Sequence, residues 1–562
     1  RENNLAGGVI GIGLWAGQAL TPNTIDKAEK ILKGELECNE ENGNPVQITK
    51  CPWCGKEISE KNYSVDKAKK RMYVKCDSEK CEFHDGLPVH LIDEDIYSHT
   101  PTYIVATIDK FAQIALNEDC SALFGTKVGK KPPELIIQDE LHLISGPLGT
   151  ITGLYEAAIK KLCEHDGIGA KVIASTATIR NAKEQINALY AANYTQFPPQ
   201  GIDFNDSFFA EISSRDERPA RLYLGCMAIG TSPTTMMIRS MAALLFASRY
   251  LYENDENDED VIDAYWTLTC YFNTLRELGG AIVRVIDDIQ DRFNYLRNSK
   301  FKTKYPMNRC EYRYDRYKEL TSREKSEDIG KVIQKELPVK FTKDHSTYPY
   351  DFVLASNMIS VGVDVSRLGS MVVVGQPKAT AEYIQATSRV GRENPGLVLT
   401  TYNQAKSRDR SHYEQFCQYH ASFYKYVEAT SITPFADRAR DRALQTLYVI
   451  LCRYFVPQLF ENKQAINYNK SIPELESVRS YIYDYVKIVD PDELEYVKQE
   501  ISDIEDEWEL RVARKEKMVY RGGKYVRHED ALFAPDYEEE NRFRVLNTMR
   551  SVETTVRVKV KE

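Results

Sequence analysis

Residues 356–392 read SNMISVGVDVSRLGSMVVVGQPKATAEYIQATSRVGR, and this stretch decides the fold. Near its end, Arg389 and Arg392 lie three positions apart beside Gly391, a spacing that would place both side chains on one face of a helix. A guanidinium is a permanently charged, planar group whose N–H donors match phosphate oxygens. Two solvated arginines on a surface helix would produce the same spacing. The neighbouring residues are therefore needed to distinguish a phosphate-binding pair from an ordinary surface helix.

Two apolar runs lie just upstream of the arginines. Residues 352–355 and 371–374 are short and apolar, and the second is rich in β-branched side chains, as is typical of buried strands. Gly362 and Asp364 fall in the connection between these runs. The stretch therefore predicts strand, G-x-D, strand and helix in that order, with the arginines at the end.

A further apolar run, residues 135–138, leads directly into Asp139-Glu140-Leu-His142. This places two adjacent carboxylates at the carboxyl edge of a sheet, where α/β proteins form their ligand sites. One carboxylate would hold the shell of a Mg²⁺ ion, and the other would orient the water that attacks the γ-phosphoryl group of ATP. A lone D-E-x-H also arises by chance, but residues 171–174 predict the next strand, and Ser175-Thr176-Ala-Thr178 follows it.

Taken together, these stretches resemble the motifs of superfamily 2 helicases. The resemblance implies an α/β fold with two RecA-like lobes that close on ATP. It implies catalytic roles for Asp139, Glu140, Arg389 and Arg392. It also implies nucleotide contacts from Asp139, His142, Gly362, Asp364, Gln385, Arg389 and Arg392. Nucleic-acid contacts would come from Thr107, Lys110, Thr176, Thr178, Ser356 and Arg408, although a helix N-cap would explain Thr107 as well.

Four of the 12 cysteines form two short-spaced pairs, Cys51/Cys54 and Cys76/Cys81. Two such pairs are typical of a tetrahedral Cys₄ zinc site, which is structural because four thiolates leave no open position. A Cys₃His site that uses His84, or four unligated thiols, would also fit the spacing. The pattern suits the reducing cytoplasm better than a disulfide framework.

The composition is that of a soluble globular protein of two to four domains, with 562 residues, 42% hydrophobic and 28% charged. No apolar run approaches the ~20 residues of a membrane span, so we expect no membrane partner. The net charge of −9 argues against a uniformly basic coat but permits a local basic groove. No G-x-x-x-x-G-K-[ST] loop occurs in the sequence, and we expect this loop upstream of Arg1.

We predict three parts. Residues 1–215 form the first RecA-like lobe, without its beginning, and contain a zinc-binding insertion at 36–92. Residues 216–430 form the second lobe, and 431–562 a mainly helical C-terminal extension.

The wording of several phrases is similar to one helicase-like family, DrmA of bacterial DISARM anti-phage defence systems. These phrases are QDELHLISGPLG at 138–149, CYFNTLRELGGA at 270–281, ELTSR at 319–323, the stretch 356–392, and NTMRSVE at 547–553. The resemblance implies a cytoplasmic protein that binds DNA, single-stranded or with a single-stranded end, and acts with a DrmB-like DUF1998 protein.

Two functions follow from these patterns. The first is an ATP-dependent DNA helicase or translocase that uses ATP, Mg²⁺ and a structural Zn²⁺. The second is a DNA-loading pseudo-helicase platform, which recognises foreign DNA and recruits partners without hydrolysing ATP.

Overall fold

The computed structural model contains two compact units. The first comprises residues 1–176, 181–194 and 430–562, and the second comprises 177–180 and 195–429. Residues 430–562, expected as a separate extension, thus pack with the N-terminal part of the chain. The structure describes residues 10–550 except 40, 127–128, 177–179, 181, 200–201, 203–205, 208–209, 212, 215, 218–219, 254–258, 302–315, 322, 325, 343–348, 361–363, 430, 523–529, 536–540 and 542.

The second unit is built on a six-stranded, wholly parallel sheet. Alternate side chains of its strands belong to two different cores, because successive residues of a strand point to opposite faces. On β13, Phe352 and Leu354 join one core, while Val353 and Ala355 join the other. In spatial order the strands are β10 (Arg221–Met227), β15 (Gly396–Tyr402), β14 (Ser370–Val374), β11 (Leu268–Phe272), β13 (Phe352–Ala355) and β12 (Tyr317–Leu320).

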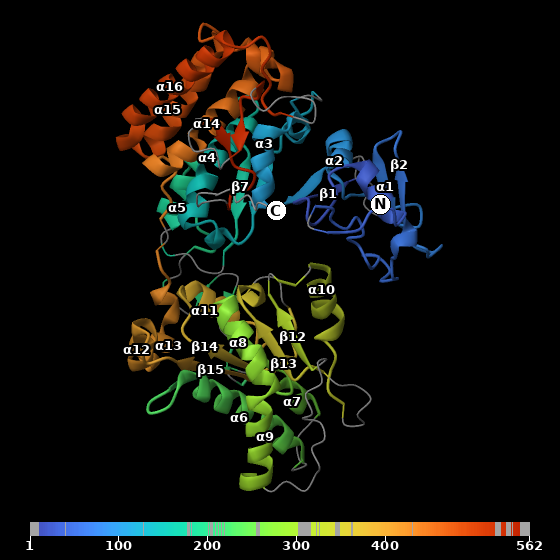
Figure 1. Cartoon of the computed structure of the whole chain (residues 1–562), viewed down its shortest axis with the longest axis vertical. Coiled ribbons are helices and arrows are strands. Elements are labelled where there is room, and N and C mark those ends of the chain that lie inside the picture. The colour runs from blue at the N-terminus through green and yellow to red at the C-terminus, as the bar shows by residue number, and fades with distance from the viewer. Residues whose placement is uncertain are drawn as a thin grey trace, which may run out of the picture. The chain divides into compact units, whose positions relative to one another are not determined.

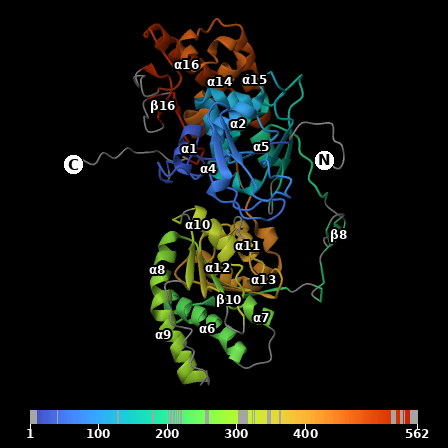
Figure 2. The ribbon, with the colours of Figure 1, turned by 90° about the vertical axis from the view of Figure 1, so that its right-hand side faces the viewer.

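Helices cover both faces of this sheet. Figure 2 shows α8 and α9 on one side of the unit and α11 and α13 on the other. Such burial on both sides is the usual condition of parallel sheets, because their crossover helices return over the faces. The helices of this unit are α6 (Pro233–Glu253), α7 (Glu259–Ala264), α8 (Leu275–Ile286), α9 (Asp288–Tyr295), α10 (Ser326–Lys331), α11 (Thr380–Thr387), α12 (Ser407–Glu414) and α13 (Phe416–Ala421), with a short pair β8 (Asp206–Ser207) and β9 (Ala210–Glu211).

The first unit contains smaller parallel pieces. One has the order β4 (Val89–His90), β1 (Ile12–Trp15), β5 (Tyr103–Ala106), and the other pairs β6 (Leu135–Gln138) with β7 (Lys171–Ala174). Ile136 packs on the hydrophobic core of the unit, whereas Leu135 and Ile137 are 50% and 53% exposed. The strand β6 is therefore half-buried on one face and leaves much of the other face in solvent.

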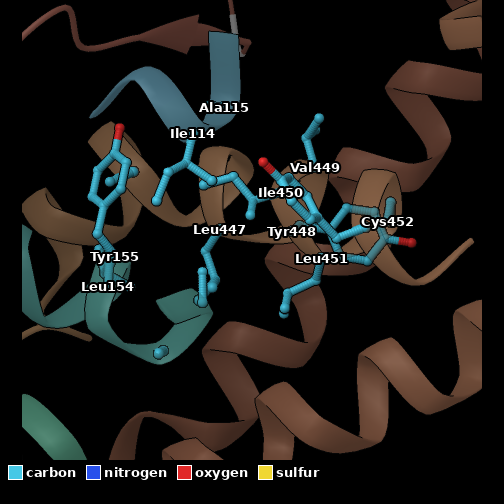
Figure 3. Packing of buried hydrophobic residues seen from close by; sticks show 14 of the residues in the cluster. Ile114, Ala115, Leu154, Tyr155, Leu447, Tyr448, Val449, Ile450, Leu451 and Cys452 are labelled. Atoms are coloured by element: carbon cyan, nitrogen blue, oxygen red, sulfur yellow. The ribbon is translucent and has the colours of Figure 1, made fainter. Parts of the chain in front are cut away.

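The core of the first unit lies mainly between helices (Figure 3). The helix α14 (Asp437–Phe455) packs against α4 (Gly146–Leu162), near which it lies in Figure 1. Gly153 on α4 permits a close approach of the segment before α14, since a Cβ there would lie 2.5 Å from Pro434 Cγ. The remaining helices are α3 (Gln113–Leu116), α5 (Ala182–Tyr190), α15 (Glu474–Val489) and α16 (Leu494–Ala513), with a short parallel pair β16 (Ala534–Pro535) and β17 (Arg544–Val545).

Buried polar groups of the C-terminal helices attach them to this core. Arg453, 1% exposed, donates from Nη1 to the carbonyl oxygen of Ala115 at 2.6 Å, and the Tyr485 hydroxyl donates to the carbonyl of Leu189 at 2.8 Å. An unpaired polar group in such a position would cost about 1–3 kcal/mol. These bonds therefore specify one docking position for the helices.

The cysteine-bearing segment, which we call the cysteine module, forms its own small core within the first unit. It consists of helix α1 (Ile25–Leu32), the antiparallel hairpin of β2 (Tyr63–Asp66) and β3 (Arg71–Val74), and loops that lead to α2 (Asp93–His99). Cys51, Cys76 and Cys81 are buried in this core. The predicted α/β class with parallel sheets, a cysteine cluster and a helical C-terminal region is confirmed. No helix in the described part of the chain is both long enough and apolar enough to cross a membrane.

Candidate functional site

The two carboxylates of the D-E-x-H sequence lie at the carboxyl edge of the β6–β7 pair. Asp139 and Glu140 directly follow β6, and Ser175 directly follows β7; the two strands run parallel, so the residues meet at one edge. The Asp139 carboxylate accepts hydrogen bonds from the Ser175 hydroxyl and, at 3.0 Å, from the backbone N–H of Glu140. Asp139 is exposed, so its remaining oxygen lone pairs can take a cation or a water shell.

His142 joins this turn to the residues after β7. Its Nδ1 lies 3.2 Å from Thr176 Oγ1 and 3.4 Å from Oε2 of Glu140. The imidazole is largely buried, with 9% of the side chain exposed, whereas the Glu140 side chain is 37% exposed. A movement of the Ser175–Thr176 segment would therefore shift the carboxylates of both Asp139 and Glu140.

Glu140 has a left-handed backbone, with φ 53° and ψ 47°. For a residue with a Cβ this conformation costs about 1–2 kcal/mol, and such strain concentrates where a side chain has to be aimed. The following residues hold it in place. The backbone N–H of Leu141 donates to the Ser175 carbonyl at 2.9 Å, and the buried Gln185 amide donates to the carbonyls of Leu141 and Ile144 at 3.2 and 2.9 Å.

The Thr107–Lys110 segment differs from a simple phosphate-binding turn. Thr107 is exposed and makes no side-chain cap bond, so its hydroxyl faces solvent. The Lys110 ammonium, by contrast, is buried and bonds the Asp93 carboxylate at 2.5 Å. Burial raises the pKa of Asp93 to about 6, although the Lys110 charge opposes this shift. Asp109 accepts bonds from Thr548 at 2.6 Å and Arg550 at 2.8 Å, so the C-terminal segment is tied to this turn.

In the second unit the helix before the two arginines ends early. We expected helix through residues 385–392, but α11 ends at Thr387 and the arginines lie in the loop that follows. Gly391 explains the ending: its φ is 70°, and its N–H donates to the Leu368 carbonyl at 2.8 Å, which draws the chain towards the sheet. A Cβ on Gly391 would lie 2.5 Å from the Cα of Gly396, so only glycine fits this approach.

Arg221 holds the arginine loop from the neighbouring strand. Its Nε donates to the Val390 carbonyl at 2.7 Å and its Nη2 to the Ser388 carbonyl at 3.2 Å. Arg389 lies between these two anchored carbonyls. Sequence reasoning missed Arg221, because an arginine at the start of a strand carries no signal of such a partner.

Arg392 is paired with the predicted nucleotide contact Asp364. The Arg392 guanidinium bonds the Asp364 carboxylate, and these side chains are 31% and 75% exposed. At this exposure the pair contributes ~0–1 kcal/mol, so a phosphate could compete for the guanidinium. Gln385 is buried on α11. Gly362 and Thr178 lie outside the described residues.

The predicted nucleic-acid contacts of this unit lie at the opposite edge of the sheet from the arginine loop. Ser356 follows the carboxyl end of β13 and is buried, and Arg408 lies exposed on α12, which follows the carboxyl end of β15. The arginine loop approaches the amino ends of β14 and β15. Strands of four to seven residues separate the edges by roughly 15–20 Å at about 3.3 Å per residue.

Further polar groups line the carboxyl edge. The Asn273 amide donates to the carbonyls of Val374 and Gly375 at 3.0 and 3.1 Å. Arg323 donates to the Leu275 carbonyl at 3.0 Å. These bonds hold the ends of neighbouring strands in a fixed arrangement, so the loops above them form one polar rim.

The four predicted metal ligands are brought together. The Sγ atoms of Cys51 and Cys81 are 3.6 Å apart, and those of Cys54 and Cys76 are 3.5 Å apart. A tetrahedral zinc site with Zn–S bonds of about 2.3 Å would require roughly 3.8 Å, so the cluster fits zinc. Burial disfavours the Cys51 thiolate, but backbone N–H groups of Cys54 and Trp53 stabilise it and lower its pKa to about 7. His84 instead bonds the Cys76 carbonyl through Nδ1, at 3.1 Å, which leaves the all-cysteine set as the better match.

A second group of metal-ligating side chains, His90, Asp95 and His99, is a poorer match for an ion. Both Nδ1 atoms lie within 3.0 Å of Asp95 Oδ1, but the Arg71 guanidinium bonds the same carboxylate at 3.0 Å. A divalent cation would have to displace that buried positive charge. Arg71 and the two histidines therefore surround the buried carboxylate of Asp95 and compensate its charge.

The comparisons with known proteins agree with this geometry. No family model matches the sequence. The chain is 38% identical over 595 aligned residues to the DISARM protein DrmA of Bacillus paralicheniformis, an alignment that covers 97% of this chain and 52% of that protein. The chain thus spans about half the length of this curated relative, and the similarity that the sequence predicted is confirmed.

The chain is also similar to solved structures, among them two helicases bound to DNA. The DUF1998 helicase MrfA bound to DNA and AMPPNP has a TM-score of 0.40 and 16% identity, with coverage of 62% of this chain and 41% of that chain. Mycobacterium smegmatis Lhr bound to ssDNA and AMP-PNP has a TM-score of 0.41 and 12% identity, with coverage of 86% and 48%. S. cerevisiae Dbp5 bound to RNA and ADP BeF3 has a TM-score of 0.32 and 11% identity, with coverage of 78% and 81%.

Proposed function

This chain is a relative of the DISARM protein DrmA, and on that premise we propose that it forms the motor core of an ATP-dependent DNA helicase or translocase in a bacterial anti-phage defence system. ATP and Mg²⁺ would bind at Asp139 and Glu140, with the phosphate-binding loop supplied from outside these residues. Arg389 and Arg392 would complete the site from the second unit. We further propose zinc at the cysteine cluster and a DrmB-like DUF1998 protein as partner.

One observation carries the proposal: the hydrogen-bonded network that joins the two strand ends of the first unit. Ser175 bonds Asp139, and His142 contacts both Thr176 and Glu140. In an ATPase that DNA stimulates, DNA binding has to change the position of the carboxylate that holds Mg²⁺ or of the carboxylate that orients water. A polar link between the carboxylates and the Ser175–Thr176 segment supplies such a connection.

In this proposal Glu140, whose backbone is left-handed, orients the attacking water. Asp139 would hold the metal-bound water shell. When bound, Mg²⁺ would neutralise charge on the β- and γ-phosphate oxygens. Arg389 and Arg392 would stabilise the charge of the transition state, and their loop is held ready by Arg221 and Gly391.

Nucleic acid would contact the exposed Thr107 in the first unit and the rim with Ser356 and Arg408 in the second. Lys110 would have to leave Asp93 before it could reach a phosphate. We therefore expect Lys110 to act on the position of this turn more than on DNA directly.

The test is Glu140→Gln in the complete protein that contains this chain. We expect DNA-stimulated ATP hydrolysis to be lost while DNA affinity, measured by fluorescence anisotropy, stays within about twofold of wild type. The reason is that the amide keeps the shape of the side chain but carries no negative charge to polarise the water and cannot accept its proton. Gln138→Glu, two residues earlier at the end of β6, is a control that alters charge without altering this carboxylate. Unchanged turnover in Glu140→Gln would refute the ATPase.

A DNA-loading platform without hydrolysis is the second candidate. The 562 residues contain no G-x-x-x-x-G-K-[ST] sequence, and a complete protein that also lacks this sequence would favour the platform. The same assay separates the two functions, because a platform binds DNA with no DNA-stimulated phosphate release from wild-type protein.

A further inference from the structure

The exposure of one tryptophan in the cysteine module is unlike that of the others in the chain. The chain has four tryptophans, of which Trp15, Trp266 and Trp508 are 0%, 3% and 0% exposed. Trp53 is 66% exposed. Burial of a large aromatic side chain would stabilise the fold by about 2–3 kcal/mol. An exposed tryptophan gives up this stabilisation, which suggests that its ring contacts a binding partner.

Trp53 is held rigidly in the turn between two predicted metal ligands. The backbone N–H of Cys51 donates to the Lys56 carbonyl at 2.8 Å, and that of Gly55 to the Cys51 carbonyl at 2.9 Å, which closes the turn. The Trp53 ring meets Phe83 edge to face, with centroids 6.1 Å apart and planes at 82°. An indole fixed in this way loses little conformational entropy when a flat partner stacks on it.

Exposed lysines surround the same cluster. Each of the four cysteines has a lysine within two positions: Lys50, Lys56, Lys75 and Lys80. All four lysines are exposed, and no ion pair with another described residue is found for them. In contrast, Lys67 and Lys70 of the adjoining hairpin pair with Glu29 and Glu94. These lysines lie beside the cysteines and Trp53, interspersed with exposed carboxylates of the same loops such as Glu57, Asp77 and Glu82.

We propose that Trp53 is a base-stacking contact for single-stranded DNA, with these lysines beside the backbone phosphates. Stacking suits a flat, sequence-independent contact, because every base offers a π-face. Glu79 and Glu82 are exposed in the same loops, so the charge is mixed and only one or two phosphates would be neutralised. The inference rests on the proposed function, because the chain must bind DNA. It adds a contact from the cysteine-bearing insertion of the first unit.

The experiment uses the complete protein and oligo-dT, with tryptophan fluorescence and anisotropy read in parallel. Because the other tryptophans of this chain are buried, quenching on addition of oligo-dT would report on Trp53, and Trp53→Phe should remove most of that signal while affinity stays within about threefold. We expect Trp53→Ala to weaken oligo-dT binding roughly tenfold. Tyr496→Ala, at an equally exposed aromatic residue of the same unit (63%), is the matched control and should bind like wild type.

An abasic strand separates stacking from phosphate contacts. Wild type should prefer oligo-dT to the abasic strand, and Trp53→Ala should lose that preference while its zinc content stays at about one per chain. Wild-type affinity in Trp53→Ala would overturn the inference and leave the proposed function standing. Absence of oligo-dT binding by wild type would instead refute DNA binding itself. A Trp53 signal that responds to a purified DUF1998 protein but not to DNA would assign the surface to protein recognition and overturn the proposal.

Discussion

The strand β13 of the second unit and the strands β6 and β7 of the first carry similar apolar sequences but differ in how far they are buried. In the second unit every residue of β13, Phe352 to Ala355, is 0% exposed. In the first unit Leu135, Ile137 and Ile173 on β6 and β7 are about half exposed, at 50%, 53% and 50%. The second unit is therefore organised by its sheet, whereas the first is organised by helices and by the cysteine module.

The residues of the two candidate sites are accordingly held in place in two different ways. The arginine loop of the second unit is fixed by the sheet, through Arg221 and the contact of Gly391 with Gly396. The carboxylates of the first unit are fixed by side chains around a short strand pair, chiefly Ser175, His142 and Gln185. A substitution in one of these sites should accordingly change the stability of its own unit and leave that of the other unit unchanged.

The largest effect should follow from metal removal, which affects only the first unit. Zinc binding to small modules is worth on the order of 10 kcal/mol, and the module has little core of its own. Cys76→Ser, or chelation, should abolish protection of residues 51–81 in hydrogen exchange while β10–β15 amides of the second unit keep theirs. Cys38→Ser, at an exposed cysteine outside the cluster, is the control. Equal loss of protection in both units would contradict the comparison.

The next largest effect should come from Arg392→Ala. Loss of an arginine that stabilises transferring phosphate lowers kcat by roughly 10³–10⁵, or ~4–7 kcal/mol in barrier. Since its partner Asp364 is largely exposed, the thermal stability of the second unit should hardly change. Arg408→Ala should instead weaken DNA binding and keep kcat at saturating DNA. If both variants lose only DNA affinity, the arginine loop has no catalytic role.

Glu156 should make the first unit sensitive to pH. This carboxyl lies buried in α4, and burial raises its pKa to about 8, from an ordinary value of 4.5. The folded state then holds a proton that the unfolded chain has released, so stability falls as pH rises from 4.5 to 8, by up to ~5 kcal/mol. Glu156→Gln should raise the melting temperature at pH 8 and change it little at pH 5. A gain that is equal at both pH values would exclude Glu156 as the titrating group.

The smallest effect distinguishes two left-handed glycines of the second unit. Gly391 and Gly230 have φ values of 70° and 73°, but a Cβ on Gly230 would meet nothing within 4 Å. Gly230→Ala should cost only the backbone term, about 1 kcal/mol, and Gly391→Ala about 3 kcal/mol because it also overlaps Gly396. Denaturant unfolding followed by probes in each unit would measure both. Equal losses would mean that the loop is not fixed by close packing.

Several features could be predicted from the sequence because they depend on local pattern. The strand 352–355, the carboxylate turn at Asp139–Glu140 and the gathering of the four cysteines all follow from short spacings. The end of α11 at Thr387 was missed, since nothing within the helix forbids continuation; the break comes from Gly391 meeting a strand that follows it. Lys110 was expected at nucleic acid, but its side chain is buried against Asp93, which precedes it by 17 positions.

By itself the sequence determined the α/β class, the cysteine cluster and the identity of the polar residues at the strand ends, because strand and turn preferences act over a few residues. Only the tertiary structure decided that residues 430–562 join the first unit, that Arg221 holds the arginine loop, and that Trp53 remains exposed. Each of these depends on contacts between residues far apart in the chain. Such contacts are set by packing and by the pairing of buried polar groups, which no local pattern encodes.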